Sequence, residues 1–159
     1  MPARLNLAAS HDVIKAMQNL QSQVNDSGLE PGLLHLMYLV VSRINGCAYC
    51  IDMHSQDLRA AGESDLRIDL VSVWEEVDCY SERERAAFAW AESVTKVSQT
   101  HVPDEVFALA SKQFSPEELS KLTLAIVAIN GWNRLCISFR SDPGHYRPGQ
   151  HTTKQTSAA

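Results

Sequence analysis

Apolar residues recur along this chain at the three- and four-residue steps of amphipathic helices. In residues 10–26 they are spaced by four, three and four residues, and Gly28 follows as a stop signal. Residues 33–44 are apolar on almost all sides, which predicts a buried segment. This pattern indicates a helix, although Val40 and Val41 leave a strand open at this position.

Asn45-Gly46 interrupts the chain, as a helix C-terminus or a turn would. The next helix is expected over residues 47–61, because it ends before Gly62. A shorter helix is expected over residues 103–113, where a proline stands at the start. Each of these segments has the length of an ordinary globular helix.

Two capping boxes mark later helix starts. Ser81 with Glu84 opens one helix, and Ser115 with Glu118 opens another. A proline follows Ser115 at the first helical position, where its missing N–H costs nothing. The second of these helices is expected to reach about Phe139 and to lie at the centre of the core, because its middle is almost wholly apolar.

These patterns predict an all-α fold with a single compact helical domain over residues 1–140. Residues 141–159 contain two prolines, two glycines and few apolar residues, which predicts a loose C-terminal arm. The chain has 159 residues, and 45% of them are hydrophobic. That is enough for one domain with a sizeable core.

Charge and targeting signals narrow the class of protein. The net charge is −5, the pI is about 5.6, and no Lys/Arg cluster is present, so nucleic acid is a poor partner. No apolar run approaches the roughly 20 residues of a membrane span. The first ten residues lack the basic start and apolar stretch of a signal peptide. A cytoplasmic location is therefore expected, where a close cysteine pair is more often catalytic or metal-binding than structural.

The candidate chemistry lies at Cys47, Cys50 and His54. In a helix these side chains share one face, because the last two lie about −60° and −20° from the first at roughly 100° per residue. The helix N-terminus favours a thiolate at Cys47, and His54 can accept the proton of Cys50 one turn away. Cys50 is thus the expected nucleophile. A peroxide would oxidise it to a sulfenic acid, which Cys47 would convert to a disulfide.

Three other interpretations stay open on the residues alone. The two cysteines can be small buried hydrophobic residues. A zinc site is the stronger rival, with Cys47, Cys50, His54 and His35 as four suitable ligands. A thioredoxin-like fold would need further strands, which the helical periods disfavour. Outside the pair, Cys79 and Cys136 lack a partner spacing, so they are expected to be semi-buried apolar residues.

Several separated motifs resemble the AhpD-like alkylhydroperoxidases of the carboxymuconolactone decarboxylase superfamily. The similarity spans roughly residues 33–146, and the motifs occur in order over residues 42–50, His54, Gly62, Trp74, 81–87, 90–92, 129–135, 139–140 and 143–144. It implies an all-helical, oligomer-forming domain, often a trimer or hexamer, with no metal or cofactor. It also implies hydroperoxide reduction, followed by re-reduction by a dithiol such as a lipoylated protein. The superfamily's lactone decarboxylases generally lack the cysteine pair.

The resemblance also implies a role for each site residue. Cys50 would form the sulfenic acid, Cys47 would give a proton and close the disulfide, and His54 would relay protons. The sequence departs from the family where a glutamate usually begins this relay, because His35 stands twelve residues before Cys47. A histidine can accept a proton near neutral pH but supplies no fixed negative charge.

A second departure lies inside the cysteine pair. Tyr49 stands there, where the best-studied branch of the family has a histidine. The missing relay carboxylate is sought on the capping-box helix, where Glu84 and Glu92 are the candidates.

Overall fold

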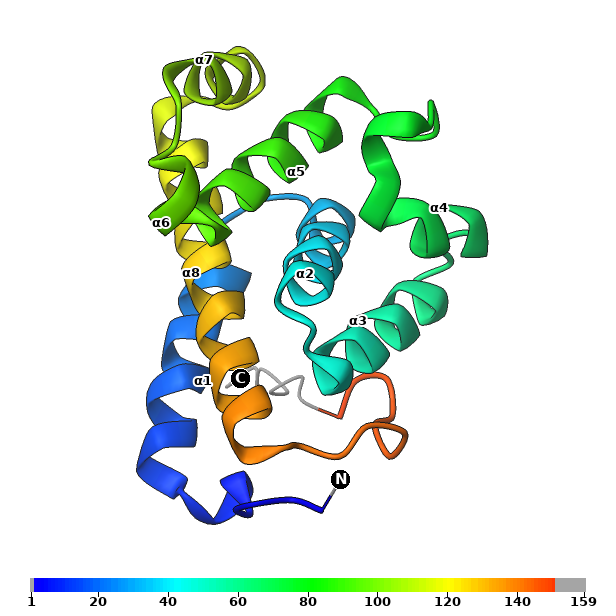
Figure 1. Cartoon of the computed structure of the whole chain (residues 1–159), viewed down its shortest axis with the longest axis vertical. Helices are drawn as coiled ribbons and strands as arrows, with labels where there is room; N and C mark the ends of the chain where they lie inside the picture. The colour runs from blue at the N-terminus through cyan, green and yellow to red at the C-terminus, as the bar shows by residue number, and fades with distance from the viewer. Residues whose placement is uncertain (1, 151–159) are drawn as a thin grey trace, which may run out of the picture.

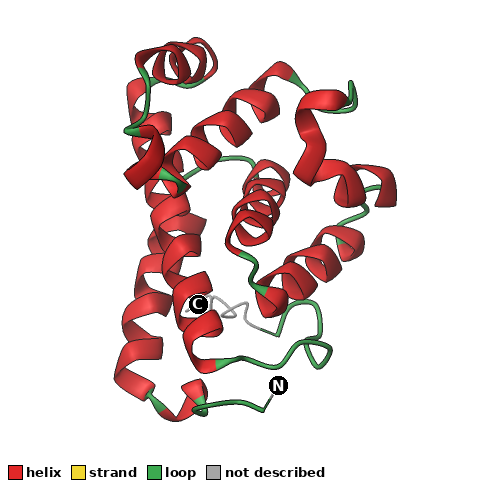
Figure 2. Cartoon of the chain, in the orientation of Figure 1, coloured by secondary structure: helices red, strands yellow, loops and turns green. Residues whose placement is uncertain are grey.

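The computed structural model describes residues 2–150, and all regular structure in that range is helical (Figures 1 and 2). The predicted all-α fold is therefore confirmed. In chain order the elements are η1 (Leu7–Ala9), α1 (His11–Asn25), α2 (Pro31–Asn45), α3 (Ala48–Ala60), α4 (Asp65–Leu70), η2 (Val71–Glu76), α5 (Glu82–Thr95), α6 (Val97–Thr100), α7 (Asp104–Gln113) and α8 (Pro116–Phe139).

Helix α2 occupies the centre of the molecule and packs against α3, α5 and α8 (Figure 1). Every residue from 36 to 42 is buried, which explains why the segment is apolar on all sides. The strand alternative for Val40 and Val41 is wrong. Pro31 begins a helix and Gly46 ends it in a left-handed conformation at φ 69°. Burial among helices outweighs the β preference of two valines.

Both predicted capping boxes are present. The Ser81 hydroxyl accepts a hydrogen bond from the Glu84 N–H, and the Glu84 carboxylate accepts one from the Ser81 N–H. Ser115 and Glu118 make the same reciprocal pair at the start of α8. Each box satisfies two N–H groups that would otherwise lack partners at the helix start.

Helix α8 is long and apolar enough, by length and composition, to cross a membrane. The expectation that no segment approaches this limit is therefore wrong for α8. However, Leu122 and Ile126 are fully buried, and the helix packs against α1, α2 and α5. These contacts are those of a core helix in a globular domain.

The C-terminal arm is anchored over its described part, contrary to the loose arm expected from residue 141 onward. The Tyr146 side chain is buried, and its hydroxyl donates a hydrogen bond of 2.7 Å to Asp57 on α3. The Gly144 N–H donates to Asp52, also on α3, over 2.8 Å. These contacts carry the arm from the end of α8 back to α3 (Figure 1). Residues 151–159 of the predicted arm lie outside the described residues.

Candidate active site

The break between α2 and α3 positions the cysteine pair. Gly46 turns the chain in a left-handed conformation, and the Cys47 N–H donates to the Ser42 carbonyl over 2.9 Å. Cys47 is then the N-cap of α3, and Cys50 lies in its first turn. Both side chains are buried and both are free thiols. The local sequence therefore places the two thiols as expected, next to the unpaired N–H groups of a helix start.

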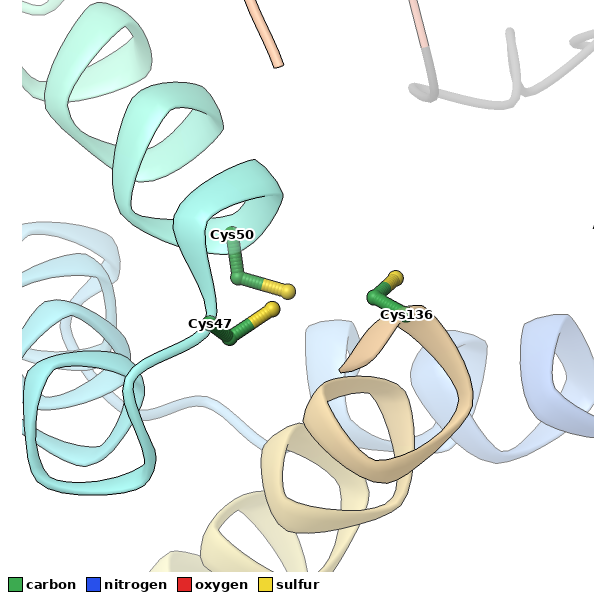
Figure 3. A group of neighbouring side chains, drawn as sticks. All are labelled: Cys47, Cys50 and Cys136. Atoms are coloured by element: carbon green, nitrogen blue, oxygen red, sulfur yellow. The ribbon is translucent and has the colours of Figure 1, made fainter. Parts of the chain in front are cut away.

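A third thiol completes this group. Cys136, near the end of α8, lies beside the pair, and the three sulfur atoms are all within 4.8 Å of one another (Figure 3). The expectation that Cys136 is a semi-buried apolar residue without a partner is wrong, because α8 brings its thiol against α3. We call Cys47, Cys50 and Cys136 the three-thiol group.

A polar bridge between α2 and α8 holds the two sides of this group together. The Asn45 amide donates to Asn130 over 3.0 Å and to Asn133 over 2.9 Å, and the Asn133 amide donates to the Ser42 hydroxyl over 3.1 Å. Asn133 is fully buried, one helical turn before Cys136. Because Asn45 lies two residues before Cys47, the bridge fixes both sets of sulfur atoms relative to each other.

The surroundings favour the protonated form of Cys47 and of Cys50. A hydrogen bond with Cys136 raises the pKa of Cys50, and the contact with Cys47 and burial raise it further. The Cys136 contact and burial also raise the pKa of Cys47 to about 11, although the Cys50 thiol and backbone N–H act in the opposite direction. Oxidation must therefore begin with a proton leaving the three-thiol group, since the thiolate is the nucleophile.

His54 lies on the same helix as the pair, but it faces a different group. Its ring is 5.8 Å from the ring of His35 and 5.1 Å from that of Tyr38, measured between centroids. His54 is buried, and neither of its nitrogens has a hydrogen-bond partner. Nδ1 of His35 also lacks one. The structure thus places His54 next to His35, as expected, but shows no hydrogen bond from His54 to Cys50.

The carboxylate of Asp57, which was not among the residues expected from the sequence, lies next to both imidazoles. Asp57 on α3 offers an oxygen that lies within 4.8 Å of the ligand nitrogens of His35 and His54. Its other contact is the hydrogen bond from the Tyr146 hydroxyl on the C-terminal arm. We call His35, His54 and Asp57 the imidazole group.

Burial keeps His54 neutral. Desolvation and the neighbouring His35 lower the pKa of His54 to about 3. Desolvation also lowers the pKa of His35, while the negative charge of Asp57 raises it in part. Two imidazoles with lowered pKa values can each accept a hydrogen bond, but both are weak bases while they are buried.

The matching family model places the chain in a known family. The model described as carboxymuconolactone decarboxylase family matches residues 11–93, about half of the chain, and includes Cys47, Cys50, His35 and His54. The chain belongs to this family. A curated relative, the uncharacterized protein YdfG of Bacillus subtilis (strain 168), is 36% identical over 125 residues, which cover 79% of this chain and 85% of the relative.

Solved structures place the chain in the AhpD-like branch of the family. A protein of unknown function from Agrobacterium tumefaciens, with the proposed name antioxidant defence protein AhpD, is 43% identical. It matches with a TM-score of 0.88 over 91% of this chain and all of that one. An AhpD-core peroxidase-related protein from Ralstonia eutropha JMP134 shares the fold at 24% identity, with a TM-score of 0.77 over 87% of this chain and 74% of that one.

The debrominase Bmp8 also shares this family fold, at 20% identity and a TM-score of 0.75, over 87% of this chain and 74% of that one. Because the identity is this low, the likeness concerns the fold alone. One helical scaffold thus serves proteins with different names, so the chemistry of this family member must be derived from its own residues.

Two carboxylates proposed for the relay of this family member lie elsewhere. Glu84 pairs with Arg67 and caps α5, and Glu92 pairs with Lys96 over 2.6 Å. Glu92 also lines a cavity of about 220 Å³ with Lys96 that contains none of the thiols. The suggestion of Glu84 or Glu92 is therefore wrong, and Asp57 is the acidic side chain beside the imidazoles.

The four zinc ligands considered from the sequence fall into two groups. Cys47 and Cys50 belong to the three-thiol group, while His35 and His54 belong to the imidazole group. The proposed tetrahedral set therefore does not form one site among the described residues.

Two residues of the site, Asp57 and Cys136, were not predicted, and the sequence contains a local signal for Asp57 only. Asp57 follows His54 by three residues, a helical spacing that puts both on one face. Cys136 lies on a distant helix, and nothing local to it points to the pair.

Proposed function

We propose that this protein is a thiol-dependent peroxidase that reduces hydroperoxides through Cys47 and Cys50. The observation that carries the proposal is the contact between two free thiols at the start of α3, with a buried imidazole one turn further on. This pairing suits oxidation to a sulfenic acid and capture by a second thiol. The proposed name of the Agrobacterium tumefaciens relative agrees with this chemistry.

The reaction proceeds in two balanced steps. The Cys50 thiolate attacks the terminal peroxide oxygen, the O–O bond breaks, and an alcohol leaves with one proton while Cys50 becomes a sulfenic acid. The Cys47 sulfur then attacks Cys50, so that a disulfide forms and the sulfenic hydroxyl leaves as water. The peroxide is thereby reduced by two electrons and the thiol pair is oxidised by two.

Proton transfer depends on hydration of the imidazole group. His54 is a weak base while it is buried, because burial lowers its pKa to about 3. Water or a peroxide that reaches its two unpaired nitrogens restores the missing hydrogen bonds and raises its pKa toward the ordinary value. His54 can then take the Cys50 proton, with Asp57 stabilising the imidazolium through His35. Substrate entry thus both delivers the peroxide and activates the base.

The proposal includes the partners and setting expected from the sequence. A dithiol, such as a lipoylated protein, returns the disulfide to two thiols, and no metal or cofactor takes part. The protein works in the cytoplasm as a homo-oligomer, a trimer or hexamer. The reductant, the lack of a metal or cofactor and the oligomer rest on the family resemblance, whereas the location does not.

Intact mass spectrometry tests the proposal directly. Brief exposure to a hydroperoxide should remove two mass units, peptide mapping should place the change at Cys47 and Cys50, and a dithiol should reverse it. An unchanged mass together with no peroxide consumption would rule out the peroxidase function. Metal analysis of the purified protein separates the zinc alternative, because stoichiometric zinc would block the same thiols.

A further inference from the structure

We propose that Cys136 is a third redox-active thiol, which exchanges with the Cys47–Cys50 disulfide and carries it from α3 to the end of α8. The inference rests on the proposed function only in requiring that the cysteine pair becomes oxidised. It makes Cys136 a catalytic residue, because its sulfur becomes part of the bond that is made and broken.

The geometry of the three-thiol group supports exchange. Cys136 contacts both sulfur atoms of the pair, and its hydrogen bonds affect the pKa values of Cys47 and of Cys50. The sulfur separation of at most 4.8 Å must fall to about 2 Å when the disulfide forms. Figure 3 shows that Cys136 comes from α8, while Cys47 and Cys50 come from the start of α3.

The exchange makes the disulfide more accessible to a reductant, because the cysteine pair is buried. Cys47 and Cys50 are each 1% exposed, whereas Cys136 is 6% exposed. A reductant must bring a thiolate to one sulfur of the disulfide, and access limits the rate of that attack. Moving one end of the disulfide to Cys136 places it on the least buried of the three cysteine residues.

The exchange balances within the protein. The Cys136 thiolate attacks one sulfur of the Cys47–Cys50 disulfide, a new S–S bond forms to that sulfur, and the other sulfur leaves as a thiolate. The leaving thiolate takes up the proton that Cys136 lost. Attack at Cys47 returns Cys50 to its reduced form, so that it can meet a second peroxide while the disulfide waits for the reductant.

A Cys47→Ser variant tests the inference, because Cys50 and Cys136 are then the two thiols that remain in the three-thiol group. The variant is treated with diamide, a diazene that oxidises thiol pairs, denatured without reductant and digested with trypsin. Cys50 lies in the tryptic peptide 44–59 and Cys136 in peptide 135–140. We expect these two peptides to be linked by a disulfide. A Cys47→Ser/Cys79→Ser variant should give the same link, and Cys47→Ser/Cys136→Ser should not.

Two results would overturn the inference. One is Cys136 remaining fully alkylatable in diamide-treated, folded Cys47→Ser protein. The other is an otherwise wild-type Cys136→Ala protein whose oxidised pair a dithiol re-reduces at the wild-type rate, because we expect this variant to be re-reduced several-fold more slowly. Cys79→Ala is the matched control for that rate, because Cys79 is a free thiol outside the three-thiol group.

The oxidant separates this inference from the proposed function. If diamide produces the Cys50–Cys136 link while hydroperoxides oxidise no cysteine, the third redox thiol stands and the peroxidase function fails. If a hydroperoxide leaves a trappable sulfenic acid on Cys50 of the Cys47→Ser variant and no link to Cys136 under either oxidant, the peroxidase chemistry stands and this inference fails.

Discussion

The three-thiol group and the imidazole group both include residues of α3, but they differ in whether their buried side-chain atoms have partners. The thiols contact one another, so each sulfur has a neighbour of the same kind. The imidazoles leave nitrogen atoms of His35 and His54 without any hydrogen-bond partner. Thiols tolerate an apolar setting, whereas a buried imidazole without a partner loses its hydration at a cost of about 1–3 kcal/mol.

This difference indicates which group is complete. The three-thiol group holds everything needed for disulfide exchange, because donor, acceptor and third thiol are already in place. The imidazole group has buried nitrogens without a protein hydrogen-bond partner among the described residues, so they can accept or donate a hydrogen bond to a bound molecule. In the proposed mechanism, oxidation and proton transfer therefore belong to separate groups of side chains, and each group can be changed alone.

The largest expected effect comes from removing the nucleophile from the three-thiol group. Cys50→Ser should reduce peroxide turnover to the level without enzyme, because a serine hydroxyl cannot form the sulfenic acid. Consumption of a hydroperoxide in the presence of excess dithiol measures this. Cys79→Ser is the control and should keep wild-type turnover; comparable losses in both variants would point to misfolding and against a role specific to Cys50.

The next effect tests whether the polar bridge holds the sulfur atoms together. Asn133→Ala removes the amide that accepts from Asn45 and donates to Ser42, leaving both without that partner. We expect the free energy of unfolding to fall by about 2–3 kcal/mol, as measured by urea denaturation. Exposed Lys112→Ala should change it by less than about 0.5 kcal/mol. An Asn133→Ala protein of wild-type stability would contradict the bridge.

The imidazole group predicts a pH dependence of stability. Because the pKa of His54 is lowered to about 3 in the folded protein from an ordinary 6.5, the unfolded state binds more protons between these values. Stability is therefore fully present above pH 6.5 and falls as pH drops toward 3, by at most about 1.4 kcal/mol per pH unit. Urea midpoints from pH 7 to pH 4 should decline less steeply in His54→Gln. Parallel declines in the two proteins would exclude His54 as the cause.

The smallest expected effect comes from a change in the imidazole group that is measured at a thiol of the three-thiol group. His35→Glu should raise the rate at which iodoacetamide alkylates Cys50 at pH 7 by a few-fold and shift the pH profile downward. A carboxylate beside His54 raises its pKa and so stabilises the imidazolium that holds the Cys50 proton. In the Cys47→Ser background, alkylation of peptide 44–59 reports on Cys50 alone. The control is His101→Glu, at an exposed histidine outside the site. An unchanged profile in a folded variant would remove position 35 from proton transfer.

The helices and the cysteine pair follow from short-range sequence signals. The capping boxes at Ser81 and Ser115, and Gly46 at the end of α2, each act within a few residues, so their geometry is encoded where it occurs. The spacing of Cys47 and Cys50 is also local, because residues three apart at a helix start lie on one face. For this reason the all-α fold and the pair of adjacent thiols were predictable before any tertiary contact was known.

Tertiary packing alone decided which side chains complete the site. Asn45 and Asn133 are 88 residues apart, and only the packing of α8 against α2 makes them partners and brings Cys136 to the pair. The packing of α3 against α2 brings His54 to His35, and Glu84 pairs with Arg67 instead. The sequence by itself determined the helices and the first two thiols, because those depend on local hydrogen bonds and periodicity. The third thiol depends on how distant helix faces meet, which no local pattern records, whereas the spacing of Asp57 from His54 on one helix is local.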